Sequence, residues 1–315
     1  MKVTDSIRRT LFRFAAFLPL TVLYFFADIT AFFLRYVIRY RRRVIFRNLR
    51  ASFPELPDRE IRHIAGDFYR NFADYIFETM KLAHISDKEM LRRMEFRNVE
   101  VVDRLFSEGK SIIAYFAHTG NWEWVPSITL HSRFADNPKF LFAQVYRPLK
   151  NKWFDGEMLS LRSRFGSVSY PKASVLRDLL TLRRDGICSI TGFMSDQKPS
   201  HGDTVHVVDF LHQPTAVITG TAKVATRMKM AVVYFDMHKI SRGHYMLDIR
   251  HITDDASEMS VAELTDIYIG MLQETIRRQP AIWLWSHNRW KIPVSFDQEE
   301  LTAVKNQSAA GAADA

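Results

Sequence analysis

The sequence predicts an α/β protein in which a mixed, largely parallel sheet is flanked by helices and an apolar helix comes first. The first observation is that short apolar segments of strand length alternate with amphipathic segments of helical period, which is typical of sheets buried on both faces. The second is that polar side chains directly follow several of these strands. The third is an N-terminal apolar segment that, at about 20 residues, is long enough to cross a bilayer.

Length and composition bound the architecture. A chain of 315 residues with 47% hydrophobic residues is long enough to bury one large core. We expect an N-terminal membrane anchor over residues 1–40, an α/β domain over 41–298 and a disordered tail over 299–315. The tail is rich in Ala, Ser and Gly, which offer little apolar surface to bury.

The net charge is +9 and the isoelectric point about 9.6. This charge suits a partner that carries phosphate or carboxylate, such as anionic lipid, an acidic carrier protein or nucleic acid, and does not choose among them. Cys188 is the single cysteine, which excludes an internal disulfide and a cysteine-based metal site. The sequence has no glycine-rich phosphate loop and no zinc-ligand spacing, so we expect neither cofactor nor metal.

The apolar segment over residues 14–38 is flanked by arginines on both sides, with more of them after it. If it spans the membrane, the positive-inside rule leaves the main domain in the cytoplasm. Asp28 is unfavourable in hydrocarbon by a few kcal/mol. This residue therefore favours either a shallow helix in the membrane plane or a contact between Asp28 and the rest of the protein.

The rest of the chain divides into expected strands and helices. Apolar or alternating patterns predict strands at 111–117, 140–146, 187–193, 205–210, 232–237 and 245–252, and an aromatic strand within 279–291. Helical periodicity predicts helices at 58–85, 173–184, 214–228 and 260–278, after a basic amphipathic segment at 43–54.

The strand at 111–117 ends at His118, and a tight polar turn leads to Glu123. On one continuous helix these two residues would lie about 140° apart, so they can meet only across a turn, which Gly120 permits. Asn121 is placed to cap a helix that starts near Trp122. A histidine oriented by a carboxylate is a general base. The turn contains no serine or cysteine nucleophile, so the proton would come from a substrate hydroxyl; the alternative is a core histidine.

Two further strands end in polar side chains. Arg147 follows the strand at 140–146, where its planar guanidinium can hold a phosphate through two hydrogen bonds. Asp196 follows the strand at 187–193 and either orients basic groups or a substrate hydroxyl, or only forms a turn. The carboxyl ends of parallel strands border the ligand crevice in such sheets. We therefore expect these residues to converge with His118.

The His118-x4-Glu123 pair after an apolar strand resembles the signature of the bacterial late acyltransferases of lipid A biosynthesis. The similarity runs from about residue 10 to residue 295. Further matching elements are Asn48-Leu49, Phe53-Pro54, Asp196-Gln197, Trp283-x-Trp285 and His287-x-Arg289-Trp290-Lys291. One departure is Phe210-Leu211-His212, where the family has Phe-Phe-Gly, which concerns acyl-chain or acceptor preference.

The resemblance implies transfer of an acyl chain from acyl carrier protein to a hydroxyl of a lipid A precursor, on the cytoplasmic side of the bacterial inner membrane. It implies contact with membrane lipids and no nucleic acid. His118 would be the general base and Glu123 would orient it. Arg147, Asp196, Arg289 and Asn121 would bind substrates, with backbone N–H groups at Gly120 and Asn121 facing the oxyanion. Two alternatives stay open: transfer to another glycolipid or phospholipid, and a non-catalytic basic adaptor on the membrane surface.

Overall fold

The computed structural model describes residues 12–200, 203 and 205–294. The tail expected at 299–315 and the first residues of the expected anchor lie outside these residues. Residues 12–17 are helical, and the N-terminal apolar segment then forms α2 (Leu20–Phe32) and the π-helical turn η1 (Phe33–Val37). Within the described residues, Leu20–Val37 is long and apolar enough to cross a membrane.

The centre of the fold is a seven-stranded sheet with the order β1-β9-β8-β2-β5-β3-β4. The strands are β1 (Met94–Arg97), β2 (Ile112–Phe116), β3 (Phe140–Tyr146), β4 (Val168–Pro171), β5 (Cys188–Met194), β8 (Ala231–Ser241) and β9 (His244–Thr253). Strands β8, β2, β5, β3 and β4 are parallel, whereas β9 runs antiparallel to β8 and pairs in parallel with β1. A separate hairpin pairs β6 (Val205–Asp209) with β7 (Pro214–Ile218). This mixed, largely parallel sheet confirms the predicted fold class.

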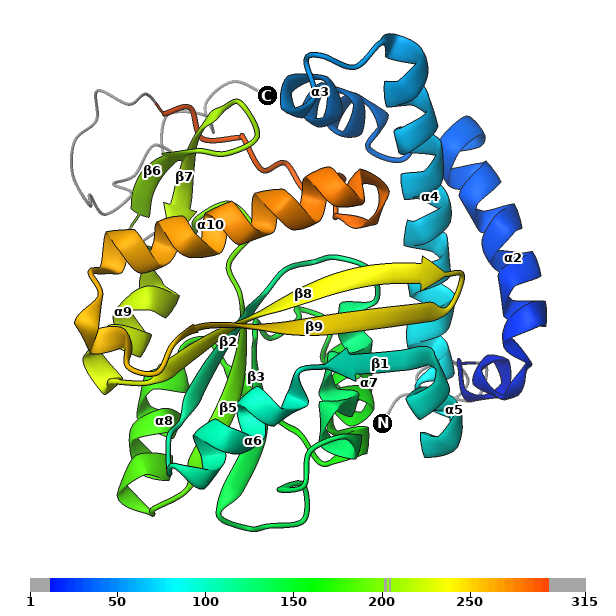
Figure 1. Ribbon diagram of the computed structural model, residues 1–315. Helices are drawn as coiled ribbons and strands as arrows, with labels where there is room; N and C mark the ends of the chain where they lie inside the picture. The colour runs from blue at the N-terminus through cyan, green and yellow to red at the C-terminus, as the bar shows by residue number, and fades with distance from the viewer. Residues whose placement is uncertain (1–11, 201–202, 204, 295–315) are drawn as a thin grey trace.

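Helices cover both faces of the sheet (Figure 1). They are α3 (Arg42–Ser52), α4 (Asp58–Lys81), α5 (Asp87–Arg93), α6 (Val99–Ser107), α7 (Lys152–Arg162), α8 (Val175–Arg184), α9 (Gly220–Met228) and α10 (Val261–Arg278). The 3₁₀ helices are η2 (Trp122–Leu130), η3 (Ser163–Phe165), η4 (Ala256–Glu258) and η5 (Pro280–Ile282). Helix α10 begins with a capping box formed by Ser260 and Glu263.

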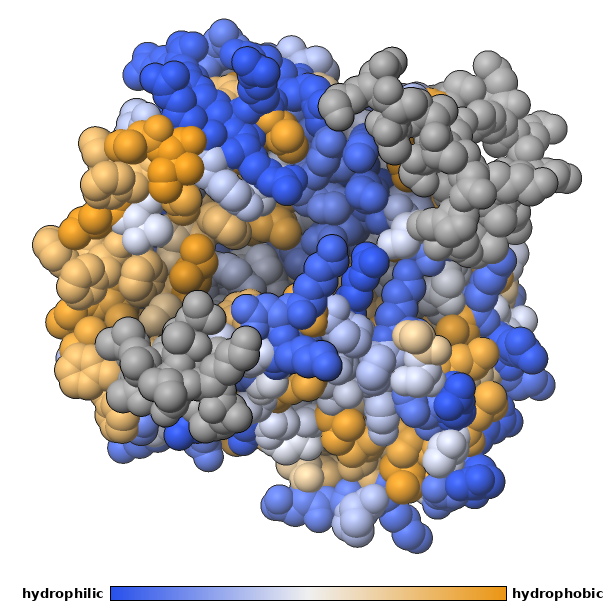
Figure 2. Space-filling view, turned by 180° about the vertical axis from the view of Figure 1, so that it is seen from behind, coloured by the Kyte–Doolittle hydropathy of each residue, from blue (hydrophilic) through white to orange (hydrophobic). Residues whose placement is uncertain are grey.

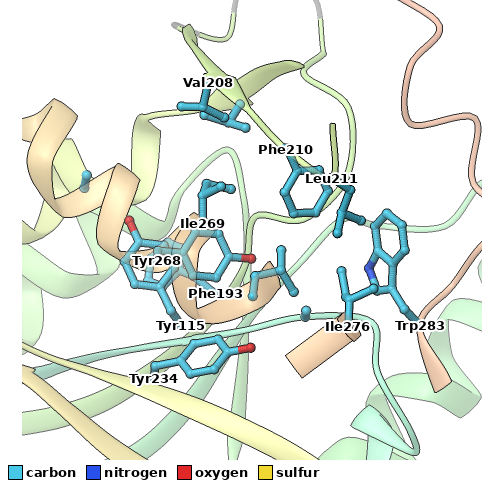
Figure 3. Close-up of a cluster of buried hydrophobic side chains, with 14 of the residues drawn as sticks. Tyr115, Phe193, Val208, Phe210, Leu211, Tyr234, Tyr268, Ile269, Ile276 and Trp283 are labelled. Atoms are coloured by element: carbon cyan, nitrogen blue, oxygen red, sulfur yellow. The ribbon is translucent and has the colours of Figure 1, made fainter. Parts of the chain in front are cut away.

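The two faces of β2 belong to different parts of the core. Ile113 and Tyr115 pack with residues of α3, α4 and α8–α10, whereas Ile112 and Ala114 pack with residues of α5, α6, η2 and α7. Figure 3 shows the first of these clusters, in which the ring of Tyr115 stacks on Tyr268 of α10 with centroids 4.3 Å apart. A strand buried on both faces matches its continuous apolar sequence.

Some elements differ from the prediction. The expected helix at 214–228 is strand β7 followed by helix α9, because Pro214–Ile218, which holds three β-branched residues, pairs with β6 before the helix begins. The expected aromatic strand within 279–291 is the short helix η5 and an irregular segment. The turn between β6 and β7 places Leu211 and His212 at φ 52° and 63°, the left-handed region that favours glycine.

The N-terminal helix α2 packs along α4 through Leu23, Ala27 and Ala31 (Figure 1). Asp28 forms an ion pair with Arg242 in the turn between β8 and β9, at 2.7 Å. The expected protein contact of Asp28 is therefore present. The opposite side of the helix is exposed and aromatic, and Figure 2 shows this apolar surface gathered on one side of the molecule.

Candidate active site

The turn after β2 places His118 at the carboxyl edge of the sheet. Gly120 has φ +56°, and a Cβ on it would lie 2.9 Å from Met237 Cγ, so this position requires glycine. Helix η5 follows α10, and the chain from the last residue of η5 onward runs alongside this turn. Leu284 N–H donates to His118 O at 3.1 Å, and Gly120 N–H donates to Ile282 O at 3.0 Å. The Gly120 N–H is therefore used within the protein, which corrects its expected role at an oxyanion.

The side chain of His118 is hydrogen-bonded to Asp196. Its Nδ1 atom lies 2.8 Å from Asp196 Oδ1, and its backbone N–H donates to Asp196 Oδ2 at 3.2 Å. Trp283 Nε1 also donates to Oδ2, at 2.9 Å. Burial raises the pKa of Asp196, but the charge of His118 and the hydrogen bonds from His118 and Trp283 outweigh burial and hold that pKa below its ordinary value. An ionised Asp196 fixes the imidazole with its proton on Nδ1 and leaves Nε2 as the basic nitrogen.

Strand register explains why these two residues meet. In the parallel pair β2–β5, Phe116 lies opposite Met194, the last residue of each strand. His118 and Asp196 both come two residues later, so they lie side by side at the same edge. Gln197 comes next, and its Nε2 lies 3.2 Å from His118 Nε2.

The carboxylate of Glu123 is occupied by another partner. Arg162 donates to it through Nε and Nη2, both at 2.7 Å, and Trp122 Nε1 donates to it at 3.2 Å. Burial lowers the pKa of Arg162, but the hydrogen bonds and charge of Glu123 offset it and raise that pKa above the ordinary value. The expected contact of Glu123 with His118 is thus replaced by the contact of Asp196, because the first turn of η2 points Glu123 toward α7.

Glu123 still reaches His118 indirectly. The ring of Trp122, which Glu123 holds, lies edge-on to the imidazole with centroids 5.1 Å apart. The ring of Tyr75 in α4 stacks on Trp122, with ring centroids 4.0 Å apart. The ion pair therefore fixes an aromatic wall beside the candidate base.

His118 and Glu123 line a cavity of about 1040 Å³ at the carboxyl edge of β2, β3 and β5. The part of its lining that belongs to the core between the sheet and η2 is apolar. The residues there are Phe116, Ile128, Phe142, Ile190 and Phe235. The side chain of His118 is 18% exposed, so the base is open to the cavity while Asp196, at 1%, is shielded.

The other expected binding residues differ in position. Arg147 is exposed and lines the cavity. Arg289 is 3% exposed and donates to Ala216 O at 2.9 Å, and burial lowers its pKa to about 10. It therefore lies in the core and is not among the residues that line the cavity. Asn121 is fully buried and donates to Glu78 Oε2 at 2.9 Å, so its side chain supports the turn and does not face a substrate.

Sequence reasoning names Trp283 and Trp285 only as part of the resemblance, and both are buried. It does not find the bond from Trp283 to Asp196 or the ion pair from Arg162 to Glu123. The only sequence signal for a role of Trp283 is that it belongs to the Trp-x-Trp element on which the family resemblance rests. Arg162 carries no local signal, because an arginine in an amphipathic helix is usually solvated.

Comparison with known proteins gives the family of this chain. The sequence profile of the bacterial lipid A biosynthesis acyltransferases matches residues 2–292. The chain belongs to this family. A lipid A biosynthesis acyltransferase of Haemophilus influenzae is 24% identical over 220 residues, which cover 68% of this chain and 66% of that protein. The match thus spans slightly less than two thirds of that relative's length.

In this member of the lipid A biosynthesis acyltransferase family, the two residues of the His-x4-Glu pair serve different partners. His118 joins Asp196, two residues after β5, and Glu123 joins Arg162 of α7. The segment around Trp283 and the basic helix α3 are also connected, since the buried Asn48 donates to Trp285 O and His287 O. Segments that resemble the family at opposite ends of the chain therefore meet around one site.

Proposed function

We propose that this protein transfers a fatty acyl chain from acyl carrier protein to a hydroxyl of a lipid A precursor. The observation that carries the proposal is the His118–Asp196 pair at the wall of a large, partly apolar cavity. The carboxylate holds one ring nitrogen and leaves the other basic, as a general base for a hydroxyl requires.

The chemistry follows from this arrangement. His118 Nε2 removes the proton of the acceptor hydroxyl while the hydroxyl oxygen attacks the thioester carbonyl carbon of the donor. A C–O bond forms and the carbonyl becomes a tetrahedral oxyanion. When this intermediate collapses, the C–S bond breaks and the leaving thiolate takes the proton from the imidazolium. Asp196 stabilises the imidazolium throughout and keeps its ring in place.

Glu123 acts as a positioning residue in this scheme. Arg162 occupies both of its oxygens, so the carboxylate is not available as a second base. Through Trp122 it keeps the wall of the cavity against the imidazole. Because catalysis depends on geometry at the scale of 1 Å, loss of this wall is expected to slow turnover.

The cavity suits an acyl donor and an anionic acceptor. The apolar side chains between the sheet and η2 offer a place for the hydrocarbon chain. Arg147 lines the cavity, Lys150 and Lys152 follow it in the sequence, and all three are exposed and positively charged. Arg147 is placed for a phosphate of the carrier's prosthetic arm or of the lipid, and the basic surface suits an acidic carrier protein.

Helix α2 attaches the protein to the membrane. Its packing along α4, whose outer surface bears Asp67 and Arg70, supports a helix in the membrane plane, because a spanning α2 would draw those charges into hydrocarbon. The excess of arginines after the apolar segment supports attachment to the cytoplasmic side of the inner membrane.

The test is direct. Purified full-length protein in detergent is incubated with acyl carrier proteins of several chain lengths and a tetra-acylated lipid A precursor, and the products are weighed by mass spectrometry. A mass gain of one acyl chain that depends on His118 supports the proposal. Gain only on a phospholipid or another glycolipid would redirect the acceptor assignment, and lipid binding that His118→Ala leaves intact, without transfer to any acceptor, would support a non-catalytic adaptor.

A further inference from the structure

The carboxylate of Glu78, in helix α4, is fully buried, with 0% exposed. Three side-chain donors contact it, each at 2.9 Å: Tyr24 O–H donates to Oε1, and Tyr245 O–H and Asn121 Nδ2 donate to Oε2. The backbone carbonyl of Glu78 also accepts a bond from Trp124 Nε1 at 3.3 Å. The mechanism above uses none of these contacts.

The donors come from parts of the fold that are far apart in the sequence. Tyr24 belongs to the N-terminal helix α2, Tyr245 to β9, and Asn121 to the turn after His118. Figure 1 shows α2 and α4 side by side at one end of the sheet. Helix α2, strand β9 and the turn that carries His118 therefore all donate hydrogen bonds to the carboxylate of Glu78.

Neighbouring contacts hold α2 in this position. Arg242, in the turn between β8 and β9, pairs with Asp28 of α2 at 2.7 Å and with Asp74 of α4 at 2.6 Å. The next residue, Gly243, has φ +69°, and a Cβ there would collide with the Tyr24 hydroxyl. The turn thus approaches α2 as closely as a glycine allows, and it sets where Tyr24 lies.

Burying the charge of Glu78 is unfavourable unless its oxygens are hydrogen-bonded, so the positions of its donors are constrained. Burial raises the pKa of Glu78, and the hydrogen bond from Asn121 and the charge of Lys239 oppose that rise. Removing the Tyr24 hydroxyl takes that donor from the buried Oε1, whereas Oε2 keeps one donor when either Tyr245 or Asn121 is changed. The three donors therefore keep one arrangement around the carboxylate.

The arrangement reaches the base through the backbone of the turn. Asn121 is fully buried and lies next to Gly120, whose conformation and surroundings allow no side chain. We infer that Glu78 is a positioning residue, which holds the turn that carries His118 and links its geometry to the seating of α2 through Tyr24. This inference rests on the proposed function, since it assigns the turn a catalytic task.

The test compares single-atom changes. Glu78→Gln replaces one acceptor oxygen by an amide donor. Tyr24→Phe removes the donor on α2 and leaves its ring, and Tyr245→Phe does the same on β9. Tyr36→Phe is the matched control, because it removes a hydroxyl from the same N-terminal segment at a ring that is 52% exposed. All variants are full-length proteins in detergent, and their unfolding curves report stability.

We expect kcat to fall about 10–100-fold in Glu78→Gln, as for a displaced catalytic group. In Tyr24→Phe we expect a fall of about fivefold, the equivalent of one net hydrogen bond of about 1 kcal/mol. The KM for the acyl donor stays the same, because none of these residues lines the cavity. Tyr36→Phe behaves like the wild type.

A second measurement does not need turnover. Diethyl pyrocarbonate modifies accessible neutral histidines, and mass spectrometry of the peptide with His118 gives its rate alone. We expect this rate to change in Glu78→Gln and Tyr24→Phe and not in Tyr36→Phe. Unchanged rates and unchanged kcat in both Tyr24→Phe and Tyr245→Phe would overturn the inference, even if Glu78→Gln does not fold. Absence of acyl transfer by the wild-type protein would instead contradict the proposed function. The modification rates would still test whether Glu78 and Tyr24 affect the surroundings of His118.

Discussion

Asp196 accepts two hydrogen bonds from His118, one from the ring at 2.8 Å and one from the backbone N–H at 3.2 Å. The carboxylate therefore fixes both the tautomer of the imidazole and the path of the chain that carries it. Trp283, near the C-terminal end of the described chain, also donates a hydrogen bond to Oδ2 of Asp196. A base held in this way needs no carboxylate from its own turn.

We predict that Asp196→Asn and His118→Ala both lower kcat by about 10²–10⁴-fold, the range for loss of a general base. The amide presents a donor or a weaker acceptor to Nδ1, so the tautomer with a basic Nε2 is no longer favoured. Initial rates of acyl transfer measure the effect, with Asp58→Asn, an exposed carboxylate paired with Arg50, as the control. A folded Asp196→Asn protein with more than about a tenth of wild-type kcat would contradict the assignment.

A second prediction concerns the Glu123–Arg162 pair, whose side chains are 3% and 17% exposed. Glu123→Gln or Arg162→Gln leaves a mostly buried charge without its partner, so each single change should lower the free energy of unfolding, by up to about 3–5 kcal/mol for a fully buried pair. Urea unfolding of both single variants and the double variant gives the coupling. Additive losses would show that the two charges do not stabilise each other.

The positions of His118, Asp196 and Arg147 follow from the sequence, and the pairing of His118 does not. Continuous apolar strands followed by polar residues place His118, Asp196 and Arg147 at the carboxyl edge, as the fold has them. Which carboxylate reaches His118 depends on the register of β2 and β5, two strands that are far apart in the sequence. Glu123, five residues away, looks nearer along the chain, but η2 turns it toward Arg162.

The same limit applies to the buried polar groups. Sequence periodicity marks Glu78 and Asn121 only as polar residues in a helix and a turn, because they bond to each other across 43 residues and the other donors to Glu78 come from β9 and α2. Arg289 reads as a cation near the crevice, whereas the structure buries it against Ala216 of β7. Long-range contacts decide these roles, and local patterns do not contain them.

Arg147 supplies a third prediction. Arg147→Ala should raise the KM of the phosphate-bearing substrate with little change in kcat, because the residue is exposed at the cavity and is not part of the His118–Asp196 pair. Arg147→Lys keeps the charge and loses the planar fork, so it should rescue only part of the loss. Arg184, exposed on α8 at the amino end of β5, is the matched control. Unchanged KM values for both substrates in Arg147→Ala would exclude this residue from binding.

His287 makes stability depend on pH. Burial lowers its pKa to about 4, and its Nε2 accepts the backbone N–H of Lys198 at 3.2 Å, which requires the neutral ring. The unfolded chain binds a proton at about pH 6.5, so the stabilising contribution is full above that pH and is lost as pH falls toward 4. We expect His287→Gln to flatten the slope of unfolding free energy between pH 6.5 and 4.5. Parallel slopes in urea titrations of the two proteins would contradict this.

The last prediction is that apolar burial, and not charge, holds the protein on the membrane. The exposed side of α2 and η1 carries Phe25, Phe26 and Phe33, which are 63%, 44% and 47% exposed. Burying half of one such ring is worth about 1 kcal/mol, so replacing all three by Ser should weaken partition into vesicles about 100-fold. Leu180→Ser, an exposed apolar residue on α8, is the control. Binding should persist in molar salt and yield to detergent, because salt screens charges and leaves apolar burial intact. Release by salt alone would assign the attachment to the arginines at 39–50 instead.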